Sequence, residues 1–122
     1  MTYDDAVSML SETLSVEPQS DVGVSDLHQE LNSPDAYIWQ GERSCILVRI
    51  RDCSTGERVC DASPAAGDLS EILEKATDAI EHFARVHNCT QIQVRAGRDG
   101  WERALKAYGY ERTAIVLRKL LV

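Results

Sequence analysis

The sequence predicts a single α/β domain of the α+β type, in which helices flank a mixed β-sheet. Two amphipathic segments open the chain, three β-prone runs follow, and two helix–strand pairs complete it. The expected element order is α-α-β-β-β-α-β-α-β. The 122 residues suit one domain, 1–122. It divides into N-terminal helices over 1–33, antiparallel strands over 36–62 and an α-β-α-β unit over 68–122.

The N-terminal helices are expected from apolar residues at helical spacing. In the first helix these residues are Tyr3, Val7, Leu10 and Leu14. A second, short helix is expected over 25–31, with Ser25 as its N-cap. Residues 32–35, Asn-Ser-Pro-Asp, end it.

Three consecutive runs predict antiparallel strands. Residues 36–39 form a short β-prone run that stops before Gly41. Residues 45–50 are apolar enough to be a central strand. The turn at 54–57 returns the chain, so residues 58–62 should pair with that central strand as a hairpin.

Residues 68–88 are the clearest helix of the sequence. Asp68 is expected to cap its N-terminus, and Glu71, three residues on, to complete a capping box. One face of this helix is an apolar stripe. The acidic residues of the opposite face are expected to be solvated: Glu71, Glu74, Asp78 and Glu81.

The remaining elements are a strand, a short helix and a final strand. Residues 91–95 alternate apolar and polar side chains, and residues 113–120 predict the last strand. Between them, Asp99 and Glu102 make a second capping box, and Gly109 ends the helix. The inner side of this helix is expected to carry Trp101, Leu105 and Tyr108.

Charge and hydropathy exclude several classes of protein. The net charge of −7 argues against a general nucleic-acid binder, and no apolar run approaches the length of a membrane span. No signal peptide begins the sequence, so the expected location is the cytoplasm. Residues 1–94 carry 17 acidic and 6 basic residues, whereas residues 95–122 carry 3 and 7. This asymmetry indicates either an interaction surface or two parts of the chain whose opposite charges compensate each other.

The cysteines and histidines predict no metal site. Cys45, Cys53, Cys60 and Cys89 match no zinc spacing and are expected to be reduced and structural. His28, His82 and His87 form no catalytic pattern that the sequence supports, and surface positions are expected for them.

Residues 97–111, Gly-Arg-Asp-Gly-Trp-Glu-Arg-Ala-Leu-Lys-Ala-Tyr-Gly-Tyr-Glu, carry a family resemblance. With the element order, this segment resembles the GNAT superfamily of acyl-CoA N-acyltransferases, in which an aromatic-glycine-aromatic signature precedes the final strand. The resemblance extends from Ala36 to Val122 and is closest to small, degenerate GNAT-like proteins of tailed bacteriophages. It implies a GNAT-like fold.

The same resemblance implies a pyrophosphate-binding loop of the form Arg/Gln-x-x-Gly-x-Gly/Ala before the long helix. In the corresponding stretch Ala62 replaces the Arg/Gln, Ala65 replaces the middle glycine, and Gly67 alone is retained. Asp68 then places a carboxylate at the helix N-terminus, where it should repel phosphate. The loop is therefore expected to be degenerate, with no bound cofactor.

The catalytic positions that the resemblance implies also differ. Leu105 stands where many members have a tyrosine that protonates the leaving thiolate, and Arg98 replaces a common asparagine. Tyr108 is nearby but is expected to pack in the core. A general base could come from one of three acids, among which the sequence does not choose: Glu42, Glu57 and Asp61.

Two functions remain open. The first is a non-catalytic GNAT-like binding or structural module, a bacteriophage virion or assembly protein, found in the host cytoplasm or the virion, with a protein partner or self-assembly. Neither nucleic acid nor membrane is expected as a partner. Its contacts would come from Arg95, Arg98, Trp101, Arg103, Arg112 and Arg118, with core packing an alternative for the tryptophan. The second is a divergent N-acyltransferase that binds acetyl-CoA differently.

Overall fold

The computed structural model describes residues 1–16, 27, 31–96, 100–114, 117 and 119–121. These residues form a four-stranded sheet with the strand order β1-β2-β3-β4. The strands are β1 (Ala36–Gln40), β2 (Ser44–Asp52), β3 (Arg58–Gly67) and β4 (Gln91–Gln93). The first three are antiparallel neighbours, and β4 lies parallel to β3. The predicted mixed sheet is confirmed.

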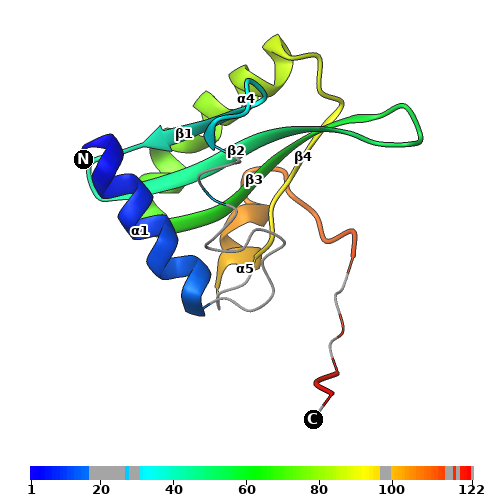
Figure 1. Ribbon diagram of the computed structural model, residues 1–122. Coiled ribbons are helices and arrows are strands. Elements are labelled where there is room, and N and C mark those ends of the chain that lie inside the picture. The colour runs from blue at the N-terminus through cyan, green and yellow to red at the C-terminus, as the bar shows by residue number, and fades with distance from the viewer. Residues whose placement is uncertain (17–26, 28–30, 97–99, 115–116, 118, 122) are drawn as a thin grey trace.

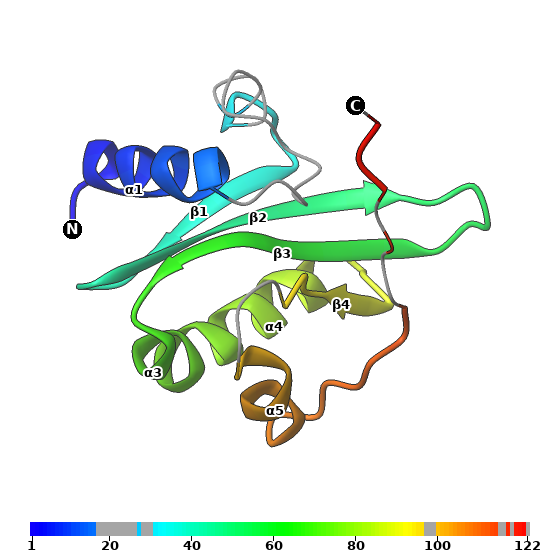
Figure 2. The same ribbon diagram turned by 90° about the horizontal axis from the view of Figure 1, so that it is seen from below.

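Helices cover both faces of the sheet (Figures 1 and 2). On one face lies α1 (Tyr3–Val16). The other face carries the predicted long helix, which is continuous but contains a π-helical turn, and the short helix after β4. These segments are α3 (Leu69–Glu71), η2 (Ile72–Ala76), α4 (Thr77–Val86) and α5 (Trp101–Lys106). None of the helices described here is long and apolar enough to cross a bilayer.

Two apolar clusters hold these layers together. Successive residues of β2 point to opposite faces, so Cys45 and Leu47 pack under α1 while Ile46 and Val48 pack under α4. Leu27 is buried in the cluster under α1. Because helices cover both faces, the central strand is apolar on both, as its uninterrupted run predicts.

The pairing of β2 with β3 contains a bulge. Ile46 pairs with Ala65 and Val48 with Ala62, so Leu47 faces two residues, Ser63 and Pro64. An extra residue of this kind bends its strand and increases the local twist. β3 therefore changes direction in the stretch that corresponds to the start of the family's pyrophosphate loop, and residues 62–67 are strand instead of loop.

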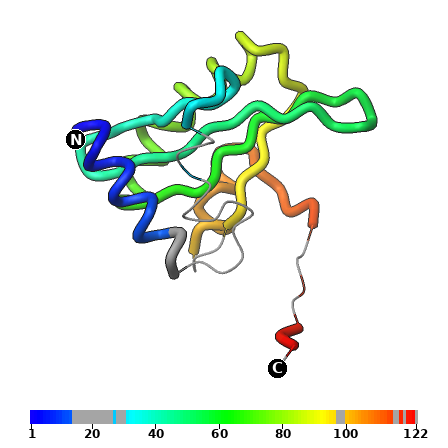
Figure 3. Tube along the Cα trace, viewed as in Figure 1, coloured from blue at the N-terminus to red at the C-terminus, as the bar shows by residue number. Residues whose placement is uncertain are grey.

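The predicted final strand over 113–120 is wrong for the residues that the structure describes. Residues 113, 114, 117, 119 and 120 are in no strand, because the chain leaves the body after α5 and has no neighbouring strand to pair with (Figure 3). The fourth strand is shorter than predicted, 91–93 instead of 91–95. Most of the second helix predicted over 25–31 lies outside the described residues.

Truncation of Leu47 tests the cluster under α1. This side chain is fully buried, so Leu47→Ala should lower the free energy of unfolding by about 2–5 kcal/mol through lost burial and the cavity left behind. Urea denaturation measures the change. Val86→Ala is the control, because Val86 is 62% exposed and should change stability by less than about 0.5 kcal/mol. Equal effects of the two substitutions would contradict this core.

Candidate functional site

The candidate site lies where β3 and β4 separate. The two strands are paired only from Val59–Gln91 to Asp61–Gln93. Beyond that point β3 continues to Gly67 while β4 has ended, and the chain after β4 touches β3 through the Arg95 amide, which donates to Ser63 Oγ at 3.2 Å. Among the described residues, no strand lies beside the outer edge of 62–67. This edge leads directly to the N-terminus of the long helix (Figure 2).

Asp68 caps that helix N-terminus as predicted. Its Oδ1 accepts a hydrogen bond from the Glu71 amide at 3.2 Å, and its backbone has the extended conformation of an N-cap. Its Oδ2 accepts from Arg43 Nε at 3.2 Å. The Glu71 amide and then the Arg43 guanidinium lower the pKa of Asp68, so the carboxylate is charged at neutral pH. A free anion at this end would meet a negative charge that already uses the helix donors.

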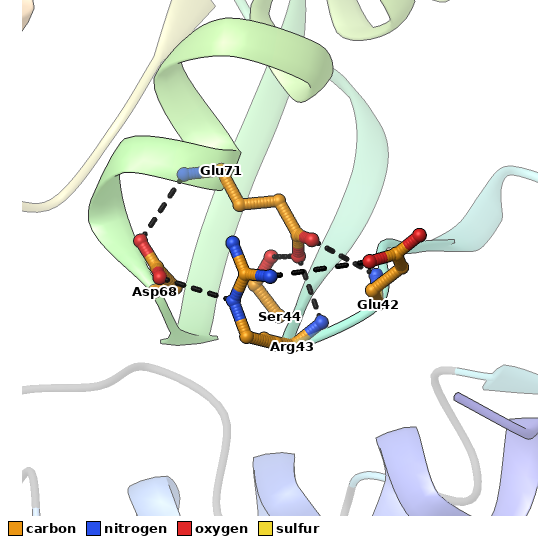
Figure 4. Close-up of polar contacts among 5 residues, drawn as sticks. All are labelled: Glu42, Arg43, Ser44, Asp68 and Glu71. Carbon is orange, nitrogen blue, oxygen red and sulfur yellow. Dashed lines mark hydrogen bonds and ion pairs between the residues drawn. The ribbon is translucent and has the colours of Figure 1, made fainter.

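Glu71 does not complete the predicted capping box and does not lie on a solvated face; both predictions are wrong. The residue is 2% exposed, and its carboxylate reaches across to the turn between β1 and β2 (Figure 4). Oε2 accepts from the Glu42 amide at 3.0 Å, and Oε1 accepts from the Arg43 amide at 2.9 Å and from the Ser44 hydroxyl. The Ser44 hydroxyl, followed by the Arg43 amide, lowers the pKa of Glu71.

The two glycines beside this network have structural roles. A Cβ at Gly67, where φ is +102°, would collide with the Arg43 carbonyl oxygen, and a Cβ at Gly41 would collide with the Glu71 carboxylate. The Asp68 amide also donates to the Arg43 carbonyl at 3.4 Å. Gly67, the retained glycine of the loop pattern, therefore permits the β1–β2 turn to approach the helix start. The packing explains its presence without a phosphate ligand.

The three acids considered as general bases lie apart. Glu42 is exposed in the β1–β2 turn, and Glu57 is exposed in the β2–β3 turn, where it accepts from Gln91 Nε2 at 2.8 Å. Asp61 alone lies where β3 and β4 separate, and it is 8% exposed. Arg51 Nε donates to its Oδ2 at 2.8 Å. Position therefore distinguishes Asp61 from the other two, a choice that the sequence did not permit.

The aromatic and aliphatic residues of α5 and its C-terminal end occupy different environments. Leu105, at the position of the family's tyrosine, is 7% exposed in the core cluster under α4. Tyr108 was expected on the inner side of the helix, but that prediction is wrong. Tyr108 is 47% exposed, because it lies beyond Lys106, where α5 ends. Tyr110 packs against the cluster, and burial raises its pKa.

One of the residues proposed for partner contacts, Trp101, is 7% exposed and belongs to the core. Core packing, the alternative given for this tryptophan, therefore replaces a partner contact. Arg112 forms a two-point ion pair with Glu102, at 2.6 Å and 2.7 Å. Arg103 is exposed beside an open concavity of about 510 Å³. Arg95 is exposed at the strand separation, whereas Arg98 and Arg118 lie outside the described residues, as does the Asp99 half of the second capping box.

All four cysteines carry free thiols. Burial raises the pKa of Cys45 to about 11 and that of Cys60 to about 12, so both remain protonated and act as small apolar side chains. His87 packs against the ring of Phe83, with ring centroids 4.2 Å apart, and His82 is exposed. Within the described part of the chain, no group of three or more His, Cys, Asp and Glu residues could hold a metal ion.

Comparison with solved structures identifies this architecture. A predicted acetyltransferase with acetyl-CoA from Clostridium acetobutylicum is 17% identical, with a TM-score of 0.68 over 96% of this chain and 88% of that one. Aminoglycoside 6'-N-acetyltransferase from Acinetobacter haemolyticus is 16% identical, with a TM-score of 0.64 over 99% of this chain and 95% of that one. Glucosamine-6-phosphate N-acetyltransferase from Arabidopsis thaliana is 11% identical, with a TM-score of 0.66 over 95% of this chain and 88% of that one.

The chain therefore has the GNAT acetyltransferase fold over nearly its whole length. No protein-family model matches the sequence, and a search of curated proteins finds no match. At identities below 20% the structural likeness establishes the fold alone.

Replacement of the Glu71 carboxylate tests its role in joining the turn to the helix. Glu71→Gln keeps the side-chain shape but removes the charge and turns an amide donor toward the Glu42 amide, the Arg43 amide or the Ser44 hydroxyl. The melting temperature should fall by about 5 °C or more, because buried donors lose their acceptor. Glu74→Gln is the matched control, since Glu74 is exposed on the same helix. Equal melting temperatures for the two variants would refute the role.

Acid should weaken the same contacts. The folded-state pKa values of Asp68 and Glu71 are lowered, so their stabilising contribution is present above the unfolded values of 3.8 and 4.5 and is lost as pH falls through the lower folded values. Urea midpoints measured from about pH 6 down to about pH 3 should therefore fall. The fall should be shallower in Glu71→Gln, and parallel curves for the two proteins would exclude Glu71 as a contributor.

Proposed function

We propose that this chain is a divergent acyl-CoA-dependent N-acyltransferase that holds its cofactor without a pyrophosphate loop. The observation that carries the proposal is the separation of β3 from β4 beside the long helix, in a chain whose fold matches acetyltransferases over nearly its full length. One of those acetyltransferases was solved with acetyl-CoA.

The open edge of β3 supports binding of the cofactor's linear arm. That arm contains two amides, and an extended chain of amides can lie beside a strand and exchange hydrogen bonds with it. Residues 62–67 have β2 on one side and, among the described residues, no strand on the other. Ala62, Ala65 and Ala66 have small side chains, which leave room for a chain lying against the strand.

Acyl transfer at this position needs few protein groups. An amine attacks the thioester carbonyl, the C–N bond forms, the C–S bond breaks, and the amine loses a proton to a base. Asp61 lies where the strands separate and is the acid best placed to take up that proton, directly or through water. With Leu105 at the position of the family's tyrosine, the departing thiolate would take its proton from water or leave as the anion.

The phosphate groups of the cofactor would need a cation in place of the loop amides. Asp68 occupies the helix N-terminus, but Arg43 lies beside it with an exposed side chain. A guanidinium can bind phosphate at two points when no carboxylate competes for it. Arg43 is therefore the group that would meet the pyrophosphate, and Asp68 is its competitor.

The arrangement of Asp68 and Leu105 favours a second candidate. In this chain a carboxylate fills the helix N-terminus, and a core leucine stands in place of the tyrosine that protonates the leaving thiolate. Both changes are expected of a non-catalytic GNAT-fold module. Such a module would act as a virion or assembly protein of a bacteriophage and bind a protein partner through exposed basic residues such as Arg95 and Arg103.

Calorimetry with acetyl-CoA separates the two candidates. The acyltransferase proposal expects binding with a Kd of about 100 µM, and about tenfold tighter binding by Asp68→Asn. Asparagine remains a good N-cap but lacks the charge, so Arg43 becomes available to phosphate. Asp78→Asn is the matched control, because Asp78 is exposed further along the same helix, and it should change Kd less than about twofold.

The outcomes of this titration are distinct. Absence of heat with the parent chain at about 1 mM acetyl-CoA would overturn the acyltransferase proposal and leave the binding module. If only Asp68→Asn binds, Asp68 itself excludes the cofactor, which also favours the module. Equal tightening by Asp68→Asn and Asp78→Asn would mean that general charge, and not the helix N-terminus, controls affinity.

A further inference from the structure

The concavity beside α5 is lined mainly by charged side chains. Its volume is about 510 Å³, and its lining residues are Gly100, Glu102, Arg103 and Lys106. Binding sites for small organic ligands commonly have volumes of about 300–1,000 Å³. The concavity is therefore large enough for a ligand of nucleotide size. It belongs to a helix that lies on the same face of the sheet as the long helix (Figure 2).

The acid in this lining is already paired. Glu102 and Lys106 are four residues apart on α5, the spacing at which an acid and a base of one helix normally form an ion pair. Instead, Arg112 donates to Glu102 at two points, from Nε to Oε1 at 2.6 Å and from Nη2 to Oε2 at 2.7 Å. These bonds lower the pKa of Glu102, so the carboxylate is charged at neutral pH. Arg112 thus takes the acid that would otherwise pair with Lys106.

Arg103 and Lys106 are the two cations that remain. Both side chains are exposed and stand three residues apart, so their Cβ atoms lie about 5–6 Å from each other on one side of the helix. Among the described residues, neither side chain has an ion-pair partner. With Glu102 and Arg112 counted, three cations and one anion give a local charge of +2 in a chain of net charge −7. Neighbouring like charges on a helix repel each other, and an anion between them would remove that repulsion.

The chemistry of the two cations favours a phosphate monoester over a carboxylate. A guanidinium binds two oxygens of one phosphate through its planar fork, while an ammonium binds as a point charge. A phosphate monoester has three terminal oxygens and a charge of about −1.5 to −2 at pH 7. It can therefore contact both cations at once, whereas a carboxylate has two oxygens and a single charge. The rest of the concavity leaves room for the nucleoside that carries the phosphate.

We propose that the concavity beside α5 binds the phosphate monoester of a nucleotide. Arg103 and Lys106 contact the phosphate, and Arg112 is a positioning residue that keeps Glu102 away from Lys106. Two sources supply this chemistry: a free nucleotide, for which adenosine 5′-monophosphate is the probe, and the 3′-phosphate of coenzyme A. Binding of the free nucleotide is independent of acyl transfer, whereas the second source rests on the proposed acyltransferase function.

A titration followed by ¹H–¹⁵N NMR measures both the place and the strength of binding. Adenosine 3′,5′-bisphosphate should bind with a Kd of about 100 µM and shift the amides of Gly100, Arg103 and Lys106 most. Arg103→Gln and Lys106→Gln should each weaken binding about fivefold or more, because each removes one charged contact. Lys75→Gln is the matched control, since Lys75 is exposed on the long helix, and it should change Kd less than about twofold.

Three results of this titration would overturn the site. The first is the absence of shifts at these amides with about 1 mM bisphosphate. The second is equal binding of adenosine, which has no phosphate. The third is equal weakening by Lys75→Gln and Arg103→Gln, which would mean that net charge alone controls binding.

Replacement of Arg112 tests its positioning role. Arg112→Gln frees Glu102 to pair with Lys106, so the bisphosphate should bind about threefold more weakly. The double variant Arg112→Gln and Glu102→Gln removes that competitor and should restore the parent Kd. If the ion pair only stabilised the fold, both variants would weaken binding equally, and that result would contradict the positioning role.

Coenzyme A and dephospho-coenzyme A, which differ only in the 3′-phosphate, distinguish the two sources. If the cofactor is the source, coenzyme A should bind about tenfold more tightly than dephospho-coenzyme A, and Arg103→Gln should abolish the difference. If a free nucleotide is the source, adenosine 5′-monophosphate should shift the same amides while the two coenzymes bind equally. Failure of the acyltransferase proposal alone therefore leaves the binding of the monophosphate intact, and failure of both arms overturns the site.

Discussion

The Glu71 carboxylate is the contact on which the rest of this end of the molecule depends. It lies at the start of the long helix and accepts from two consecutive amides and one hydroxyl of the β1–β2 turn. A turn that brings successive amides to one side leaves them without backbone acceptors, and burial makes that loss costly. One charged side chain satisfies them and fixes the distance between the sheet edge and the helix.

That contact decides what the helix N-terminus can do. Because Glu71 holds the turn in place, Arg43 lies beside Asp68, and Gly67 must lack a side chain to make room. Asp68 then accepts from the helix amides that would face a phosphate in a binding loop. The turn, the glycine and the cap are one structural unit, and the helix end is satisfied internally.

The sequence predicts most elements because local patterns determine them. The apolar stripe of the long helix, the Asp68 cap and the uninterrupted apolar run of β2 are each a local sequence pattern, and each is confirmed. The same reasoning failed for Glu71, which was predicted to be exposed and is buried. Helical spacing places it among exposed acids, whereas its environment comes from a turn 27–29 residues earlier in the chain. No local pattern reports a partner at that separation.

The candidate site shows the same division. Once the family pattern is applied, the sequence shows that Ala62 and Ala65 replace residues of the pyrophosphate loop. It does not show the bulge in β3 or the point at which β3 separates from β4. The choice of Asp61 among three acids also required the register of β3 with β4, because only the register shows which acid lies where the strands part.

The final strand was predicted from the local sequence of residues 113–120, and strand formation additionally requires a neighbouring edge. The described sheet ends at β1 and at β4, and the described residues after Arg112 pair with neither of these strands. The sequence thus contains a strand-prone segment and the sheet contains open edges, but the described residues of the segment are not paired with them. The misprediction has a physical content: β-propensity is a property of the segment, whereas a strand is a property of the segment together with its partner.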